Sequence, residues 1–108
     1  MSKQQTFIDL CLAGEASIEE IDDFVDAWHA DPEGGELHYY LGMTEEEYSL
    51  WLRAPDALPC ILRARRDREE LTTAVSRAYE TMRLAPSGND AATIARLRIW
   101  LKKKGVLA

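Results

Sequence analysis

Residues 37–52, LHYYLGMTEEEYSLWL, decide the fold that this sequence predicts. Gly42 can adopt the left-handed backbone conformation that ends a first short helix. Thr44 can cap a second helix, and Glu47, three residues later, completes a capping box. The stretch therefore has the pattern of two short helices joined by a tight turn, a helix-turn-helix.

The second of these helices has an apolar side and an acidic start. Tyr48, Trp51 and Leu52 follow the i, i+3, i+4 spacing, so we expect them to pack on the first helix. Glu45 and Glu46 lie where a DNA-reading helix would enter the major groove. Because the phosphates that flank this groove repel carboxylates, we do not expect this helix to read DNA.

The rest of the chain predicts further helices, because no segment alternates like a strand and the long segments fit a period near 3.6. We expect an all-α fold in two domains. Residues 1–66 form a bundle of about five short helices around the helix-turn-helix, and residues 67–108 form a basic helical hairpin. The helices outside the motif are expected at about residues 3–13, 18–30, 56–66, 67–84 and 91–104, with loops at 31–35 and 85–89.

Capping and periodicity define the two helices of the hairpin. Asp67-Arg68-Glu69-Glu70 has the pattern of a capping box, and Gly105 is expected to end the last helix. The expected inner positions are Leu71, Val75, Ala78 and Met82 on the first helix, and Ile94, Leu97, Ile99, Trp100 and Leu101 on the second.

Composition places the chain among soluble globular proteins. Its 108 residues are 46% hydrophobic, which is enough to build a core. No apolar run approaches the about 18 residues that a membrane span needs. The N-terminal segment has one lysine and a short apolar run broken by Asp9, unlike a secretory signal. We expect a cytoplasmic protein that does not enter a membrane.

The net charge of −6 is divided unevenly along the chain. Residues 1–56 contain fourteen Asp and Glu and two Lys and Arg, whereas residues 57–108 contain five and eleven. Two regions of opposite potential can steer different partners, or pair two copies head to tail. The simpler interpretation is that each charge only solvates its own helix.

Two sets of charged residues are candidate binding surfaces. The acidic set lies on the polar sides of two predicted helices and is a candidate surface for a basic protein: Glu19, Asp22, Asp23, Asp26, Glu45 and Glu46. The basic set lies around Trp100 and contains candidate nucleic-acid contacts: Arg96, Arg98, Lys102, Lys103 and Lys104. For the basic set we favour a structural interpretation, in which the cations suit the end of a helix and Trp100 lies in the core.

No grouping of residues indicates catalysis. The sequence has no glycine-rich phosphate loop, no His-Glu-x-x-His pattern and no nameable nucleophile–base pair. Cys11 and Cys60 lie in apolar helical segments and are expected to be buried reduced thiols. His29 and His38 are not at ligand spacing from either cysteine. We therefore expect no enzymatic activity, no metal and no cofactor.

The segment ELHYYLGMTEEEYSLWLRAPDALP, residues 36–59, resembles the helix-turn-helix of the Cro/lambda-repressor-like (Xre-type) family. The family's leucine-rich helix, Leu-Gly turn, hydroxyl cap and Ser-x-Trp correspond to Leu37, Leu41-Gly42, Thr44 and Ser49-Leu50-Trp51. The segment departs from the family at His38, where a small residue is usual, and at Glu45-Glu46-Glu47, where polar DNA-reading residues are usual. The resemblance implies the scaffold without its usual DNA contacts.

Residues 6–66 also resemble small bacterial proteins that are associated with toxin–antitoxin gene pairs. This resemblance implies an antitoxin-like or regulatory protein that binds another protein stoichiometrically, such as a basic toxin or nuclease. One alternative is a helix-turn-helix transcriptional regulator that uses the basic C-terminal half for phosphate contacts. Another is a phage-encoded inhibitor whose carboxylates imitate nucleic-acid phosphates. The sequence also allows a homodimer.

Overall fold

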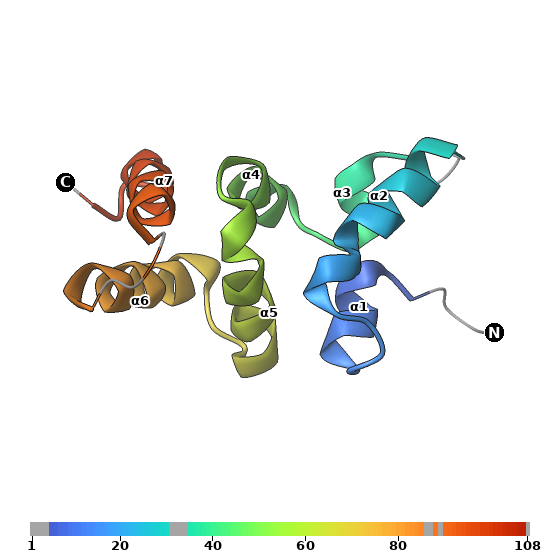
Figure 1. Ribbon diagram of the computed structural model, residues 1–108, viewed down its shortest axis with the longest axis horizontal. Helices are drawn as coiled ribbons and strands as arrows, with labels where there is room; N and C mark the ends of the chain where they lie inside the picture. The colour runs from blue at the N-terminus through green and yellow to red at the C-terminus, as the bar shows by residue number, and fades with distance from the viewer. Residues whose placement is uncertain (1–4, 31–34, 86–87, 89, 108) are drawn as a thin grey trace. The chain divides into compact units, whose positions relative to one another are not determined.

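The computed structural model describes residues 5–30, 35–85, 88 and 90–107, and every secondary-structure element in these residues is helical (Figure 1). The prediction of an all-α fold is therefore confirmed. The predicted helix start at residue 3 and most of the loops predicted at 31–35 and 85–89 lie outside the described residues. The elements are α1 (Phe7–Leu12), η1 (Ile18–Glu20), α2 (Ile21–Ala30), α3 (Leu37–Leu41), α4 (Glu45–Arg53), η3 (Pro55–Ala57), α5 (Leu58–Asp67), α6 (Leu71–Leu84) and α7 (Asp90–Lys103).

The chain divides into two compact units, residues 1–48 and 49–108, with the division inside α4. The domain boundary that we predicted after residue 66 falls inside the second unit, between two helices that pack on each other, α5 and α6. The division of charge follows the two units. Residues 1–48 contain thirteen acidic residues and one basic residue, whereas residues 49–108 contain six and twelve. Each unit is described below by itself.

The first unit is built on α1, which carries a complete capping box. The Thr6 hydroxyl accepts a hydrogen bond from the Asp9 amide, and the Asp9 carboxylate accepts one from the Thr6 amide, both at 3.2 Å. Phe7 and Ile8 are fully buried, and the Phe7 ring meets the edge of Phe24 of α2 with 5.0 Å between the ring centroids. Both α1 and α2 also pack on α3, so α3 lies against two neighbours within this unit.

Gly42 closes α3 as predicted, with a left-handed φ of 87°. The Met43 amide donates a hydrogen bond to the His38 carbonyl at 2.8 Å, which satisfies one of the last carbonyls of the helix. Glycine is required here for a second reason. A Cβ at this position would lie 2.6 Å from the Thr6 Cβ, so the turn is packed directly against the cap of α1.

The start of α4 was predicted correctly, but its buried face was not. The Thr44 amide donates to the Glu47 carboxylate at 2.9 Å, and the Glu47 amide donates to the Thr44 hydroxyl at 3.1 Å. The buried residues are Glu47, which is 6% exposed, and Leu50, three residues later. Leu52, predicted to face inward, is 59% exposed. The capping box turns the Glu47 carboxylate back onto the backbone, and this lets an acidic residue take a place on the buried face.

The two aromatic residues of α4 lie on a half-buried side of this helix. Tyr48 and Trp51, both predicted to be inward, are half-buried. The Tyr48 ring lies beside that of His38 on α3, with 5.6 Å between the centroids and a tilt of 41°. The expected contact between the two helices of the motif therefore exists, and Tyr48 provides it.

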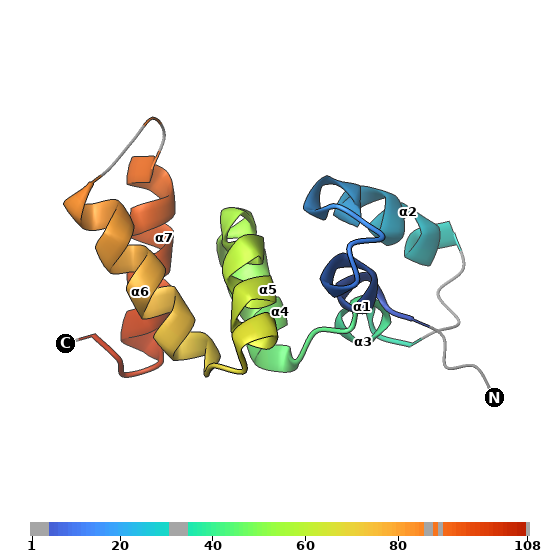
Figure 2. The same ribbon diagram turned by 90° about the horizontal axis from the view of Figure 1, so that it is seen from below.

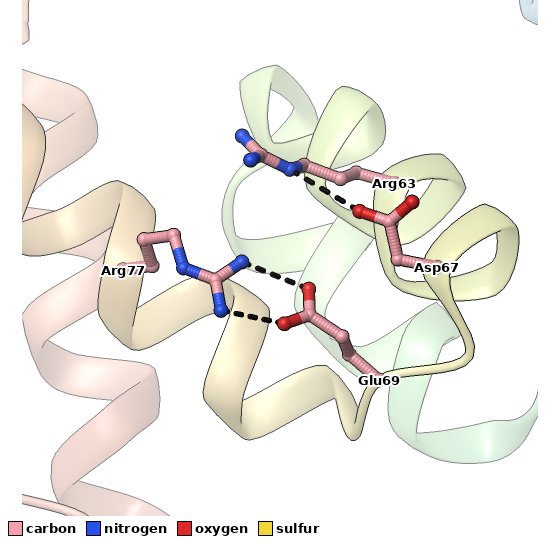
Figure 3. A network of polar contacts seen from close by, with 4 residues as sticks. All are labelled: Arg63, Asp67, Glu69 and Arg77. Atoms are coloured by element: carbon pink, nitrogen blue, oxygen red, sulfur yellow. Dashed lines mark hydrogen bonds and ion pairs between the residues drawn. The ribbon is translucent and has the colours of Figure 1, made fainter.

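In the second unit, the predicted capping box at residues 67–70 is wrong. Asp67 is the last residue of α5, and Arg68 follows in the left-handed conformation with a φ of 56°. Glu70 precedes α6 without a side-chain capping bond. The Glu69 carboxylate instead receives two hydrogen bonds from the Arg77 guanidinium, at 2.9 and 2.5 Å, as Figure 3 shows. This bidentate pair joins the turn before α6 to the middle of that helix.

The helical hairpin consists of α6 and α7, which lie side by side in both views (Figures 1 and 2). On α6, Ala78 and Met82 were predicted to be buried but are half-buried, and Tyr79 is buried instead. On α7, Trp100 is buried as predicted, whereas Ile99 is 50% exposed, contrary to the prediction. The other core residues of the hairpin are Leu71, Ala74, Val75, Thr93, Leu97 and Leu101.

Candidate functional surfaces

Four of the six predicted acidic residues form one stripe on the first unit. Glu19, Asp22, Asp23 and Asp26 lie at positions i, i+3, i+4 and i+7 along η1 and α2, and all four side chains are exposed. This spacing places them on one side of the helix. The opposite side of the same segment carries Ile21, which is buried. We call these four residues the acidic stripe.

In the part of the chain that the structure describes, no cation forms an ion pair with the aspartates of the acidic stripe. The start of α2 stabilises Asp22 and Asp23 through the helix dipole. Asp26 lies beyond the first turn, where this effect has faded, and like charges four residues apart destabilise a helix by about 0.2–0.5 kcal/mol per pair. The stripe therefore carries repulsion that a bound cationic surface would relieve.

Glu19, the first residue of the stripe, accepts local hydrogen bonds that favour its ionised form. Hydrogen bonds from its own backbone amide and from the Ser17 side chain hold the pKa of Glu19 below its usual value. Next to it, the Glu20 carboxylate accepts a hydrogen bond from the Ser17 amide at 2.7 Å and so caps the segment. Glu20 thus has a structural role, and the stripe residues beside it remain exposed.

Glu45 and Glu46, the other two predicted acidic residues, lie apart from the stripe in sequence, in the first turn of α4. Glu45 is exposed and Glu46 is half-buried. Carboxylates in the first turn of a helix are favoured by its dipole. A local structural reason therefore exists for these two residues, and the acidic stripe is the stronger candidate surface.

The basic residues of α7 are exposed, as their candidate role requires, but the aromatic residue among them is not. Trp100 is 2% exposed, and its indole N–H donates a hydrogen bond to the Ser49 hydroxyl at 3.2 Å. The ring therefore lies in the core, as the structural interpretation expected, and cannot stack on a base. Lys104 lies over this ring, with 5.5 Å from its ammonium to the centroid. The exposed basic residues are Arg96, Arg98, Lys102, Lys103 and Lys104.

A hollow that we did not predict lies in the second unit, between the end of α4 and the middle of α7. It has a volume of about 170 Å³ and is lined by Arg53, Arg96 and Ile99. No sequence signal joins these residues, because 43 positions separate the two arginines and only the packing of α4 against α7 brings them together. Ile99, which we had placed inside the hairpin, is half-exposed and lines this hollow.

Both cysteines are free thiols, as predicted. Cys11 is buried and Cys60 half-buried, and burial raises the pKa of each thiol above its ordinary value. Within the described parts of the chain, no three His, Cys, Asp or Glu side chains come together in a way that could hold a metal ion.

No protein family, curated protein or solved structure matches this chain. The resemblance of residues 36–59 to the Xre-type helix-turn-helix, and of residues 6–66 to antitoxin-like proteins, therefore stays a prediction. Among the helices that the structure describes, none is both long and apolar enough to span a bilayer.

Proposed function

We propose that this protein is a small antitoxin-like or regulatory protein of the bacterial cytoplasm, which acts by binding a basic protein partner stoichiometrically and not by catalysis. The acidic stripe of η1 and α2 is the proposed binding surface. The observation that carries the proposal is the set of three aspartates on α2, Asp22, Asp23 and Asp26, which are exposed, share one side of the helix and have no ion-pair partner among the described residues.

Electrostatics explains how such a surface would work. Residues 1–48, with thirteen acidic residues and one basic residue, would attract a cationic protein from a distance and raise the association rate. On contact, lysine or arginine side chains of the partner would pair with the stripe and remove the repulsion between Asp22 and Asp26.

The proposal is tested by affinity capture from the native host. The test variant neutralises the four residues of the acidic stripe, with Asp22, Asp23 and Asp26 replaced by Asn and Glu19 replaced by Gln. We expect the wild-type protein to recover a basic partner at low salt and the variant to lose it. Recovery of the same partner at the same salt concentration would show that the acidic residues are not the interface.

A matched control separates this surface from net charge in general. The control variant replaces four other exposed acidic residues with Gln and so removes the same number of negative charges: Glu15, Glu36, Glu70 and Glu80. We expect it to retain the partner. If both variants lose the partner equally, the interaction follows the total charge and the proposed surface is wrong. A partner that is a nuclease acting on DNA would favour the nucleic-acid mimic over the antitoxin.

A second candidate function is DNA binding through the basic end of α7, favoured by the exposed Arg98, Lys102 and Lys103. It predicts that replacing these residues with Gln weakens duplex binding and lowers its salt dependence. Replacing Glu45 and Glu46 with Gln should leave such binding unchanged or strengthen it, because repulsion is removed. A loss of sequence-specific affinity in that double variant would show that the glutamates read bases.

A further inference from the structure

The outward face of α7 carries cations along both of its edges. Arg98 and Lys102, four residues apart, lie on one edge, and both are exposed. Arg96 and Lys103, seven residues apart, lie on the other edge and are exposed as well. Between the two edges lie exposed residues with short side chains: Ala91, Ala92 and Ala95. This face of α7 is therefore basic at both edges and shallow in the middle.

No described carboxylate forms an ion pair with these four cations. The helix dipole accounts for Lys102 and Lys103, which lie in the last turn. It does not account for Arg96 and Arg98, which lie before that turn. Arg98 and Lys102 also repel each other, because like charges four residues apart on a helix are neighbours. Within the described residues, the outward face of α7 is thus an unpartnered helix face.

The acidic stripe complements this face in charge and in spacing. Asp22 and Asp26 are four residues apart, as are Arg98 and Lys102, and each pair spans about 6 Å along its helix axis. The whole stripe, from Glu19 to Asp26, spans seven residues, which is also the separation of the cations on the other edge of α7. The acids lie near the start of α2 and the cations near the end of α7. Antiparallel packing therefore brings opposite charges together and also suits the two helix dipoles.

We propose that the outward face of α7 docks on the acidic stripe of a second copy of this protein. The carboxylates would lie over the alanines, where short side chains let two helices approach, and between the two rows of cations. Each copy carries both surfaces, so two copies can pair reciprocally in a closed dimer. The proposal shares the acidic stripe with the function proposed above but names a different occupant, which a basic protein partner would have to displace.

The test is sedimentation velocity of the purified whole protein, from micromolar to millimolar concentration. In about 0.1 M NaCl we expect the average mass to rise with concentration towards that of a dimer. In about 1 M NaCl, where the Debye length falls from about 10 Å to about 3 Å, we expect the monomer. Because no other protein is present, the result is independent of whether affinity capture recovers a foreign partner.

Two charge-reversal variants locate the contact. One carries Asp22→Lys and Asp26→Lys, and the other carries Arg98→Glu and Lys102→Glu. Each variant alone should associate at least about tenfold more weakly than the wild type, because like charges then face each other. An equimolar mixture of the two should associate again, because the reversed stripe of one variant meets the reversed helix of the other.

A matched control separates this contact from net charge. Glu15→Lys combined with Glu70→Lys makes the same change in charge at exposed positions outside the stripe, and should leave self-association within about twofold. Far-ultraviolet circular dichroism checks that every variant remains folded.

Two results would overturn the proposal. One is a wild-type protein that stays monomeric at every concentration in low salt. The other is a mixture of the two folded reversal variants that associates no better than either variant alone, which would show that α7 and the acidic stripe do not meet.

Discussion

The polar side chains of the two units form hydrogen bonds over different distances along the chain. In the first unit, the capping boxes of Thr6 and Thr44 join residues three positions apart. The carboxylates of the acidic stripe are exposed, and none forms an ion pair with a described cation. In the second unit, polar bonds join distant parts of the chain, such as Trp100 to Ser49 and Thr93 to Asp56. The comparison teaches that polar groups fix the tertiary register in one unit and define local helix ends in the other.

The largest expected effect concerns the core of the second unit. Trp100→Ala removes a buried ring together with its bond to Ser49, and should lower the free energy of unfolding by about 3–5 kcal/mol. Trp51→Ala, on the half-buried side of α4, should cost clearly less. Urea titrations of both variants measure this difference. Equal costs would show that the two tryptophans do not differ in burial as described.

The turn of the first unit provides the next largest effect. Gly42→Ala both forces an L-residue to a φ of 87° and places a Cβ against Thr6, so we expect a loss of about 2–4 kcal/mol. Gly14→Ala is the matched control, since Gly14 has a φ of 77° but no atom within 4 Å of an added Cβ. Its cost should be limited to about 1–2 kcal/mol of backbone strain. Equal losses in the two variants would refute the packing of this turn against the cap of α1.

A smaller effect is expected from the buried carboxylate of α4. Glu47→Ala removes the side chain that accepts the hydrogen bond from the Thr44 amide, and should lower the free energy of unfolding by about 1 kcal/mol. Glu45→Ala, in the same turn but exposed, is the control and should change stability by less than about 0.5 kcal/mol. A larger loss in the control than in Glu47→Ala would contradict the capping role.

The smallest expected effect is the pH dependence of stability that the ion pair between Glu69 and Arg77 contributes. Arg77 holds the pKa of Glu69 below its ordinary value of 4.5, so the pair stabilises the folded state fully above that value. This contribution is lost as the pH falls through the lowered pKa of the folded protein. Glu69→Gln should therefore reduce stability near neutral pH and show a shallower fall in acid than the wild type.

The control for this pH effect is Glu70→Gln, the neighbouring exposed carboxylate, for which no ion pair with a described residue is found. Thermal unfolding of both variants from about pH 6 to about pH 3 makes the comparison. Identical curves for the two variants would show that the Glu69–Arg77 pair does not stabilise the fold.

Capping patterns in the sequence correctly predicted those helix ends whose hydrogen-bond partners lie within a few residues along the chain. Gly42 and the Thr44–Glu47 box were foreseen because the groups that satisfy the helix end are within three residues. The same rule failed at Asp67, because Arg68 adopts the left-handed conformation usually given to glycine and Glu69 binds Arg77 eight residues away. A pattern that reads only neighbouring residues cannot detect such a competing partner.

The acidic stripe and the hollow also differ in whether the sequence could predict them. The exposure of the acidic stripe was predictable, since the spacing of Ile21 and the aspartates is a property of one helix. The hollow at Arg53 and Arg96 was not predictable, because it depends on the register of two helices that only the folded core sets. The burial of Glu47 was not predicted, because periodicity assigns a carboxylate to the solvent side unless its hydrogen bonds are known.

The most direct test of the central claim is the salt dependence of the association rate with the captured partner. The wild-type protein and the control variant at Glu15, Glu36, Glu70 and Glu80 should both associate more slowly as salt rises, with similar steep slopes. Neutralising the stripe alone, with Asp22, Asp23 and Asp26 replaced by Asn, should flatten that slope and slow association at low salt. A slope as steep in the stripe variant as in the wild type would contradict the assignment of the acidic stripe as the binding surface.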